Sequence, residues 1–425
     1  MTSPNSFLGG AQDRLLPASI PFRFFLTAAV FHVLAWITLF LAANQLAWYT
    51  GGPGRVLASL HLVTLGVFAM TAIGASYQLL PVVTRRPLLR DWPARLSFWL
   101  FLPGVLGLAW GMGAVSPLLM QGGAILVGAG LAVFGALTAD NLRRAGSLPV
   151  VAAHGWGALA ALVGFAGLGI LLVWDMTGGF LANRATLALT HMVLASYGFM
   201  GLLVLGLGLV LIPMFALSRA APKRLGWAQL ALAGLALTAY FVGGISGAAP
   251  LRWLALLAGS MAIAVYFWTM RLVLAGRMRK RLGLSFLLIR ASWGFLALSL
   301  GLGGLVLAGV GGPSLPALFG FTLIAGWLLT FLLGILQRIL PFLASMHASG
   351  KSGLPPPLSS LTAEVPLRIH AVFHFAALVT CAGGILLDMT LLVQIGAALG
   401  VVGALAFLGF AVNVVLKLRL EQQTT

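Results

Sequence analysis

The stretch 60–81 reads LHLVTLGVFAMTAIGASYQLLP, an apolar helix with a histidine as its second residue and a proline as its last. The same layout recurs at 191–213, which begins HMVLAS, and at 321–341, which begins FTLIAG. The marked position is histidine in two copies and phenylalanine in the third. This recurrence predicts a threefold membrane scaffold with ionisable side chains on two of its three corresponding helices.

The composition excludes a soluble globule. Of the 425 residues 60% are hydrophobic and only 8% are charged, and the mean hydropathy is +1.06. So few charges cannot cover the surface of a soluble domain, so we expect a polytopic membrane protein. The single cysteine, Cys381, lies in an apolar run, which excludes a disulfide framework and a Cys-x-x-Cys metal site.

Apolar runs of about 20 residues predict an all-α protein of twelve transmembrane helices. The runs are roughly 22–48, 55–82, 95–115, 118–140, 149–174, 185–216, 225–247, 251–273, 286–311, 314–341, 366–387 and 391–416. Breaks near 145 and 283 divide the membrane domain, 22–420, into three pseudo-symmetric four-helix units at about 22–144, 149–275 and 286–420. The recurring helix is then the second helix of each unit. The segment 1–21 is polar and lacks the order of a cleaved signal peptide, so we expect a cytoplasmic tail.

The formal net charge of +18 is mostly a topology signal. With both termini in the cytoplasm, 22 of the 25 Lys and Arg residues lie on the inner side, and only Arg55, Arg184 and Arg252 lie outside. This distribution predicts a multi-pass protein of the bacterial cytoplasmic (inner) membrane. The expected partner of the charge is the lipid bilayer, in particular its anionic lipids, and not nucleic acid.

His61 and His191 are the strongest candidate ligands. Each lies six or seven residues into a span that enters from the outer side, which places both side chains about 9–10 Å below the outer surface. Imidazoles at one depth on related helices could hold a metal or cofactor. The alternative is a pair of core histidines, each bonded to a backbone carbonyl.

His370 and His374 are spaced i, i+4 and share one helix face. They could form half of a metal site, or one could be an axial ligand that its neighbour supports. Alternatively they are an interfacial pair bonded to lipid headgroups or loop carbonyls. His32 and His154 stand alone in the pattern, and His347 is expected in a solvated loop.

Twelve helices in three arcs, with a histidine near the outer face of helix 2 and an apolar run to a proline, resemble subunit I of the haem-copper oxidase superfamily. The strings PFRFFL (21–26), LLP (79–81), RPL (86–88) and LIPMF (211–215) look closer to the NnrS-like branch, which is associated with haem, copper and nitric oxide stress. The resemblance implies that His61 is an axial haem ligand, with haem b as the cofactor and copper as a second possibility. Arg55 and Arg184 would pair with the haem propionates, or anchor the helices at the membrane edge.

Several positions depart from the oxidase pattern. Helix 10 has Phe321 where the oxidases carry a His-x-His, and span 7 has no histidine pair for copper. Ala195 replaces the tyrosine that follows the helix 6 histidine, and Ser59 stands where the NnrS-like pattern has a first histidine. These departures predict that a complete oxygen- or nitric oxide-reducing centre is absent.

Three functions are therefore open. The first is a haem- or copper-binding protein in electron transfer or in the handling of nitric oxide and respiratory stress, with an electron donor or respiratory complex as partner. The second is a twelve-span transporter of a small solute or metal, which the absence of a carboxylate in the middle of the membrane disfavours. The third is a structural or assembly subunit of a respiratory complex.

Overall fold

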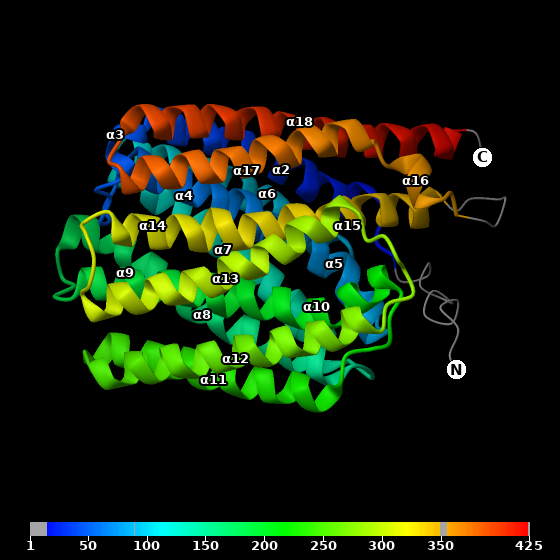
Figure 1. Cartoon of the computed structure of the whole chain (residues 1–425), viewed down its shortest axis with the longest axis horizontal. Coiled ribbons are helices and arrows are strands. Elements are labelled where there is room, and N and C mark those ends of the chain that lie inside the picture. The colour runs from blue at the N-terminus through cyan, green and yellow to red at the C-terminus, as the bar shows by residue number, and fades with distance from the viewer. Residues whose placement is uncertain (1–14, 89, 349–354, 424–425) are drawn as a thin grey trace.

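The computed structural model describes residues 15–88, 90–348 and 355–423, and every regular element among them is helical. Twelve helices are long and apolar enough to cross a membrane, which confirms the predicted all-α polytopic class. They lie side by side in one bundle (Figure 1). The helices α2 and α18 begin and end the described bundle at the same end, as an even number of spans requires.

Nine of the spans are single continuous helices, and two short helices connect them or flank them. They are α2 (Ser19–Leu41), α3 (Ala43–Leu46), α6 (Trp92–Gly113), α7 (Pro117–Arg143), α8 (Pro149–Gly178), α11 (Lys223–Ser246), α12 (Ala249–Ala275), α13 (Leu284–Ala308), α16 (Leu358–Leu361), α17 (Glu364–Leu386) and α18 (Thr390–Gln423).

The other three spans are those that carry the recurring sequence, and each contains a π-helical segment. The spans are α4 (Arg55–His61), η2 (Leu62–Ala69) and α5 (Met70–Thr84); α9 (Arg184–Val193), η3 (Leu194–Met200) and α10 (Gly201–Ala216); and α14 (Leu315–Phe321), η4 (Thr322–Leu329) and α15 (Thr330–Ala348). A π-helical turn is a rare feature that concentrates at functional sites. It therefore distinguishes these three helices from their nine neighbours.

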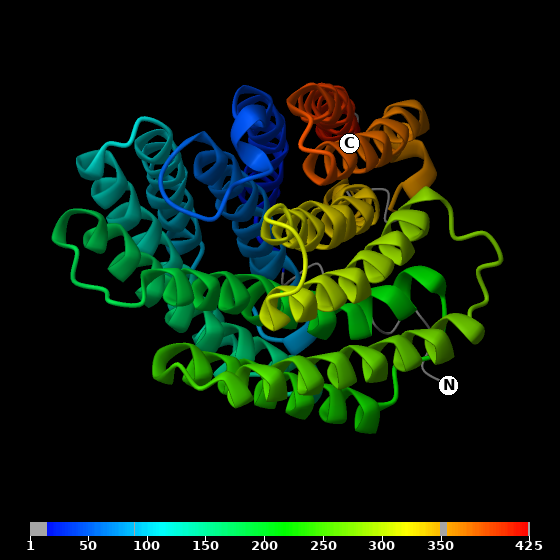
Figure 2. The ribbon, with the colours of Figure 1, turned by 60° about the vertical axis from the view of Figure 1, so that its left-hand side comes forward.

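These three helices are also the inner ones. In their most apolar windows 72, 78 and 89% of the residues are buried, against 50% or less in each of the other spans. The segments η2 and η3 each contact η4. The outer hairpins α6–α7, α11–α12 and α17–α18 lie on three different sides of the bundle (Figure 2), and α18 also packs against α2.

The inner helices share a register, and this register corrects the predicted correspondence of His61, His191 and Phe321. In each of them the proline lies 19 residues after the first residue of the π-helical segment, and the helix continues past it instead of ending there. In this register His61 corresponds to Val193 and Phe321, because each of the three directly precedes the π-helical segment. His191 lies two residues earlier, and its counterparts are Ser59 and Phe319. The two histidines are thus not equivalent positions, and the spacing of 22 residues from His191 to its proline, against 20 elsewhere, was the signal.

The common register supports the division into three units, which stays a prediction.

Glycines allow the helices of a hairpin to approach closely. A Cβ atom on Gly123 of α7 would lie 2.3 Å from the backbone nitrogen of Leu108 in α6. In lipid there is no hydrophobic driving force between helices, so their association depends on the close van der Waals packing that small residues allow.

Candidate functional site

His61 is the last residue of α4 and directly precedes the π-helical segment η2. Its side chain is half-buried, and its Nδ1 lies 3.0 Å from the carbonyl oxygen of Leu57, one turn earlier. A carbonyl only accepts hydrogen bonds, so Nδ1 carries the proton and donates it. The Nε2 atom of a neutral ring then keeps its lone pair free.

His191 of α9 has the same arrangement with a carbonyl of another helix. Its Nδ1–H donates to the carbonyl oxygen of Phe165 in α8, at 2.8 Å. The phenyl ring of Phe165 lies edge-on to the imidazole, with ring centres 5.9 Å apart. Gly169, one turn further along α8, leaves room for the ring, because a Cβ atom there would lie 3.0 Å from His191 Cε1.

The two imidazoles lie together. Their ring centres are 6.5 Å apart and their planes differ by 19°. Within the part of the chain that the structure describes, no hydrogen-bond partner reaches either Nε2. Two imidazoles on opposite sides of one metal atom, with metal–nitrogen bonds of about 2.0–2.1 Å, would have ring centres roughly 6 Å apart. The ring separation is therefore of the size that one metal between two neutral imidazoles would need.

A metal that needs more protein ligands does not fit this pair. Among the described residues no group of three or more His, Cys, Asp or Glu side chains is arranged to hold a metal ion. Haem iron takes its other four ligands from the porphyrin, so it needs only axial ligands from the protein. Copper is bound well by imidazole. Haem iron and copper are therefore the two metals to which a pair of imidazoles is suited.

Arg55 and Arg184, which were predicted to lie on the outer side of the membrane, differ in their contacts. Arg55 is exposed at the first residue of α4, six residues before His61. Arg184 forms an ion pair with Asp175, whose other carboxylate oxygen accepts the backbone N–H of Leu181 at 2.6 Å. Arg184 would therefore have to leave Asp175 before it could bind another carboxylate.

His370 and His374 lie in the interior of the protein, with exposed fractions of 0 and 1%. Their ring centres are 5.4 Å apart. His370 Nδ1–H donates to the carbonyl oxygen of Gly403 in α18, at 3.0 Å, and His374 Nε2 lies 2.8 Å from Thr330 Oγ1 in α15. The alternative of an interfacial pair bonded to headgroups or loops is therefore wrong, because both partners belong to spanning helices.

His32 joins this pair, which the sequence had not indicated. It lies in α2, its exposed fraction is 1%, and its ring centre is 6.2 Å from that of His370. Its Nε2 accepts the indole N–H of Trp36 at 3.0 Å. Two nitrogens of the cluster, His32 Nδ1 and His370 Nε2, are buried with no partner among the described residues.

The hydrogen bonds fix the ring tautomers of this second cluster. Because His32 Nε2 accepts a proton, the neutral ring carries its proton on Nδ1, and this atom is a donor and not a metal ligand. His370 Nε2 is a free acceptor for the opposite reason. His32 Nδ1–H is thus a free donor and His370 Nε2 a free acceptor. This combination suits a group that both accepts and donates, such as one water molecule, better than a metal held by both rings.

The remaining histidines have structural contacts. His154 lies 2.8 Å through Nδ1 from the carbonyl oxygen of Val150 and 2.6 Å through Nε2 from the side-chain amide of Gln229. His347 lies in α15 and not in a loop, and it contacts the carbonyl oxygens of Leu343 and Leu16 at 2.8 and 2.9 Å.

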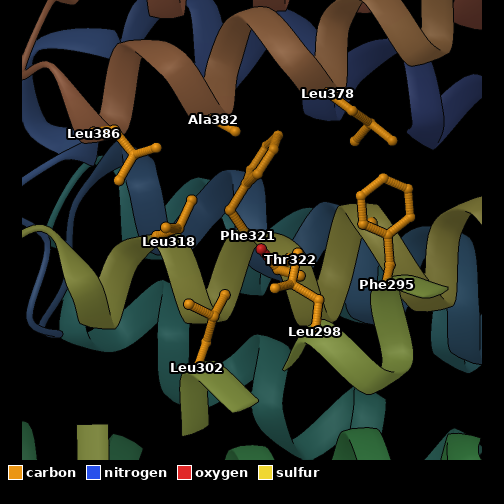
Figure 3. Close-up of a pocket in the computed structure, with 10 residues that line it drawn as sticks. Phe295, Leu298, Leu302, Leu318, Phe321, Thr322, Leu378, Ala382 and Leu386 are labelled. Carbon is orange, nitrogen blue, oxygen red and sulfur yellow. The ribbon is translucent and has the colours of Figure 1, made fainter. Parts of the chain in front are cut away.

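The third inner helix has no ligand at the corresponding position. Phe321 lines an apolar cavity of about 300 Å³ between α13, α14 and α17 (Figure 3). Its ring points towards Ala382 of α17. Tyr197 of η3 stacks on Trp327 of η4, with ring centres 5.3 Å apart, and its hydroxyl lies 2.9 Å from Ser299 Oγ. The tyrosine is therefore engaged with α13 and η4.

The fold is similar to that of a haem-copper terminal oxidase whose dimer is known from cryo-electron microscopy. The TM-score is 0.62 with 12% sequence identity, over 94% of this chain and 84% of that chain. No protein-family model matches the chain, and no curated protein sequence matches it. The chain is thus a multi-pass membrane protein with the fold of haem-copper oxidase subunit I, as the resemblance in sequence implied. Its relation to the NnrS-like branch stays a prediction.

Proposed function

We propose that this protein binds haem or copper on a haem-copper oxidase-like scaffold, and that His61 and His191 are the ligands. It would act in electron transfer or in the handling of nitric oxide and respiratory stress, in the bacterial cytoplasmic membrane with both termini inside. The observation that carries the proposal is the pair of imidazoles with ring centres 6.5 Å apart. Their Nδ1–H groups donate to carbonyl oxygens.

The hydrogen bond of the second ring nitrogen supports a ligand role for these histidines over a purely structural one. Metal-bound histidines usually donate their other N–H to a carbonyl or carboxylate, which fixes the tautomer and the ring orientation. His61 and His191 both have this contact. A core histidine satisfied by the protein would use both nitrogens, as His154 does with Val150 and Gln229.

Haem b supplies a one-electron couple when bound, and copper supplies another. The chain's own residues would hold the metal between two helices, exclude bulk water and set the local polarity. Arg55 and Arg184 stand on the outer side of the pair, six and seven residues before His61 and His191. Both are proposed to neutralise propionates if the group is haem. His370 and His374 would form a second metal site, separate from the His61–His191 pair.

A complete gas-reducing centre does not form part of the proposal. Such a centre needs further ligands close to the metal. The corresponding residue of helix 10 is Phe321, which faces an apolar cavity. Tyr197 is bonded to Ser299 instead of facing the histidine pair. The protein would therefore carry electrons or a ligand without reducing oxygen or nitric oxide at a binuclear site.

The test is a visible spectrum and metal analysis of the purified protein in detergent. We expect haem bands that respond to dithionite, or bound copper near one equivalent. Either should be lost in His61→Ala and in His191→Ala, and retained in His347→Gln, which changes a histidine outside the pair. A folded wild-type protein that stays colourless and metal-free after reconstitution with haemin or copper would contradict the proposal.

A further inference from the structure

Two loops at one end of the bundle carry a high density of positive charge. Segment 217–224, which comprises the connection after α10 and the first two residues of α11, contains three Lys or Arg residues, and segment 276–283 connects α12 to α13 and contains four. Neither segment contains a carboxylate. Both lie at the end of the bundle where α18 ends (Figure 1). Membrane topology alone explains the sign of this charge, but not its arrangement.

The two loops are joined by backbone contacts. The N–H of Met278 donates to the carbonyl oxygen of Leu217 at 3.0 Å, and the N–H of Arg279 donates to the carbonyl oxygen of Ala216 at 3.4 Å. The Arg279 guanidinium also approaches the carbonyl oxygen of Phe215, at 3.4 Å. These contacts place Arg279 over the end of the inner helix α10.

Arg338 reaches the same place from the inner helix α15. Its Nε donates to Ser285 Oγ at 2.8 Å and its Nη2 to the carbonyl oxygen of Leu282 at 2.5 Å. These bonds hold the half-buried guanidinium against Leu282 of segment 276–283, three residues after Arg279. Phe342, one turn after Arg338, packs edge-on against Phe215, whose carbonyl oxygen the Arg279 guanidinium approaches. Both arginines therefore lie at the same corner of the bundle. The ion pairs that the structure shows within its described residues involve Arg95, Arg144, Arg184 and Arg368, and neither Arg279 nor Arg338.

Two guanidinium groups that form no ion pair with a carboxylate of the described residues call for an external anion. Each retains N–H donors beyond those used by the protein. The planar fork of N–H groups in guanidinium matches the geometry of phosphate oxygens, so arginine is the side chain best suited to bind a phosphate. The site lies at the ends of spanning helices, at the level where headgroup phosphates lie in a bilayer. Basic pockets between transmembrane helices are a recurring binding mode for anionic phospholipids.

We propose that Arg279 and Arg338 form a specific site for the headgroup phosphate of an anionic phospholipid, next to the ends of α10 and α13. Arg338 is the fixed donor and Arg279 closes the site from the loop. The surrounding exposed cations, Arg277, Lys280 and Arg281, attract the lipid without holding it in one geometry. This site does not depend on a metal at His61 and His191.

The experiment measures lipid retention by native mass spectrometry of the full chain, equilibrated with phosphatidylglycerol or with phosphatidylcholine. We expect retained phosphatidylglycerol, with affinity about tenfold lower in Arg279→Gln, since one charge-assisted hydrogen bond is worth about 1.5 kcal/mol or more. Arg338→Gln should lower it by at least as much. Arg419→Gln, which removes the same charge at an exposed position of α18, should leave retention unchanged.

Three outcomes would overturn the inference. Equal loss of lipid in Arg419→Gln would show a diffuse charge effect instead of a site. Unchanged retention in Arg279→Gln would show that the pair does not bind lipid; thermal unfolding of this variant checks that loss of the Arg279 contact with the Phe215 carbonyl oxygen leaves the protein folded. Complete displacement of the lipid by millimolar inorganic phosphate would assign the site to a free anion.

Discussion

Gly169 gives the sharpest test of the His61–His191 pair, because it supports His191 without being a ligand. Gly169 lies one turn after Phe165 on α8, and Phe165 provides the carbonyl oxygen that holds His191. An added Cβ atom would lie 3.0 Å from His191 Cε1 and 3.3 Å from Nδ1. Ordinary carbon–carbon contacts are about 3.5–4.0 Å. Gly169→Ala therefore requires the ring to move by a few tenths of an ångström.

A movement of this size is comparable with the tolerance of metal coordination. Metal–ligand distances are held to within about 0.2 Å, and loss of a residue that orients a ligand usually lowers metal affinity by about 10–100-fold. The displaced ring would also stretch its bond to Phe165. We expect Gly169→Ala to bind haem or copper at least about tenfold more weakly than the wild type.

Gly167→Ala is the matched control, since it lies two residues away on the same helix and its added Cβ atom would have no neighbour within 4 Å. Both substitutions gain similar helix propensity, of up to about 1 kcal/mol. Metal titration followed by absorption spectroscopy gives the affinities, and thermal unfolding in detergent confirms that both variants fold. Equal metal affinity in Gly169→Ala and Gly167→Ala would refute the placement of His191 as a ligand.

Two further predictions concern packing and buried hydrogen bonds. Thr330→Val removes the hydroxyl that contacts His374 Nε2 at 2.8 Å, so we expect a loss of about 1–2 kcal/mol in the free energy of unfolding; Thr330→Ser should restore it, and chemical denaturation in mixed micelles measures both. Gly123→Ala would place a Cβ atom 2.3 Å from Leu108 N, whereas Gly122→Ala would meet nothing within 4 Å. Overpacking should cost the first variant about 1–3 kcal/mol and the second nothing, as measured by thermal unfolding, and equal unfolding temperatures would contradict the close approach of α6 and α7.

The candidate site was partly predictable. Counting residues from the helix entry placed His61 and His191 in one layer, because the rise per residue of a helix is fixed. The structure indeed brings their rings together. The sequence alignment nevertheless took the two histidines as equivalent, and the π-helical register shows an offset of two residues. Only the direction of each side chain decides whether two histidines at one depth meet.

The His32 cluster could not be predicted. His32 and His370 are separated by more than 300 residues, and the contact depends on α18, which packs against both α2 and α17. Trp36 at i+4 from His32 was the available signal, because an indole N–H on the same helix face needs an acceptor. Nothing in the local sequence indicates which histidine of another helix lies opposite.

The sequence by itself determined the class, the twelve spans and the even topology of this protein. Hydropathy and charge act locally, since each spanning segment must satisfy its backbone hydrogen bonds within itself and exclude charge from lipid. The tertiary structure alone decided which helices are inner, which histidines meet, and which arginines are brought to the same corner of the bundle. These facts depend on helix packing and side-chain direction, which lipid solvation does not constrain because every apolar face is equally soluble in the bilayer.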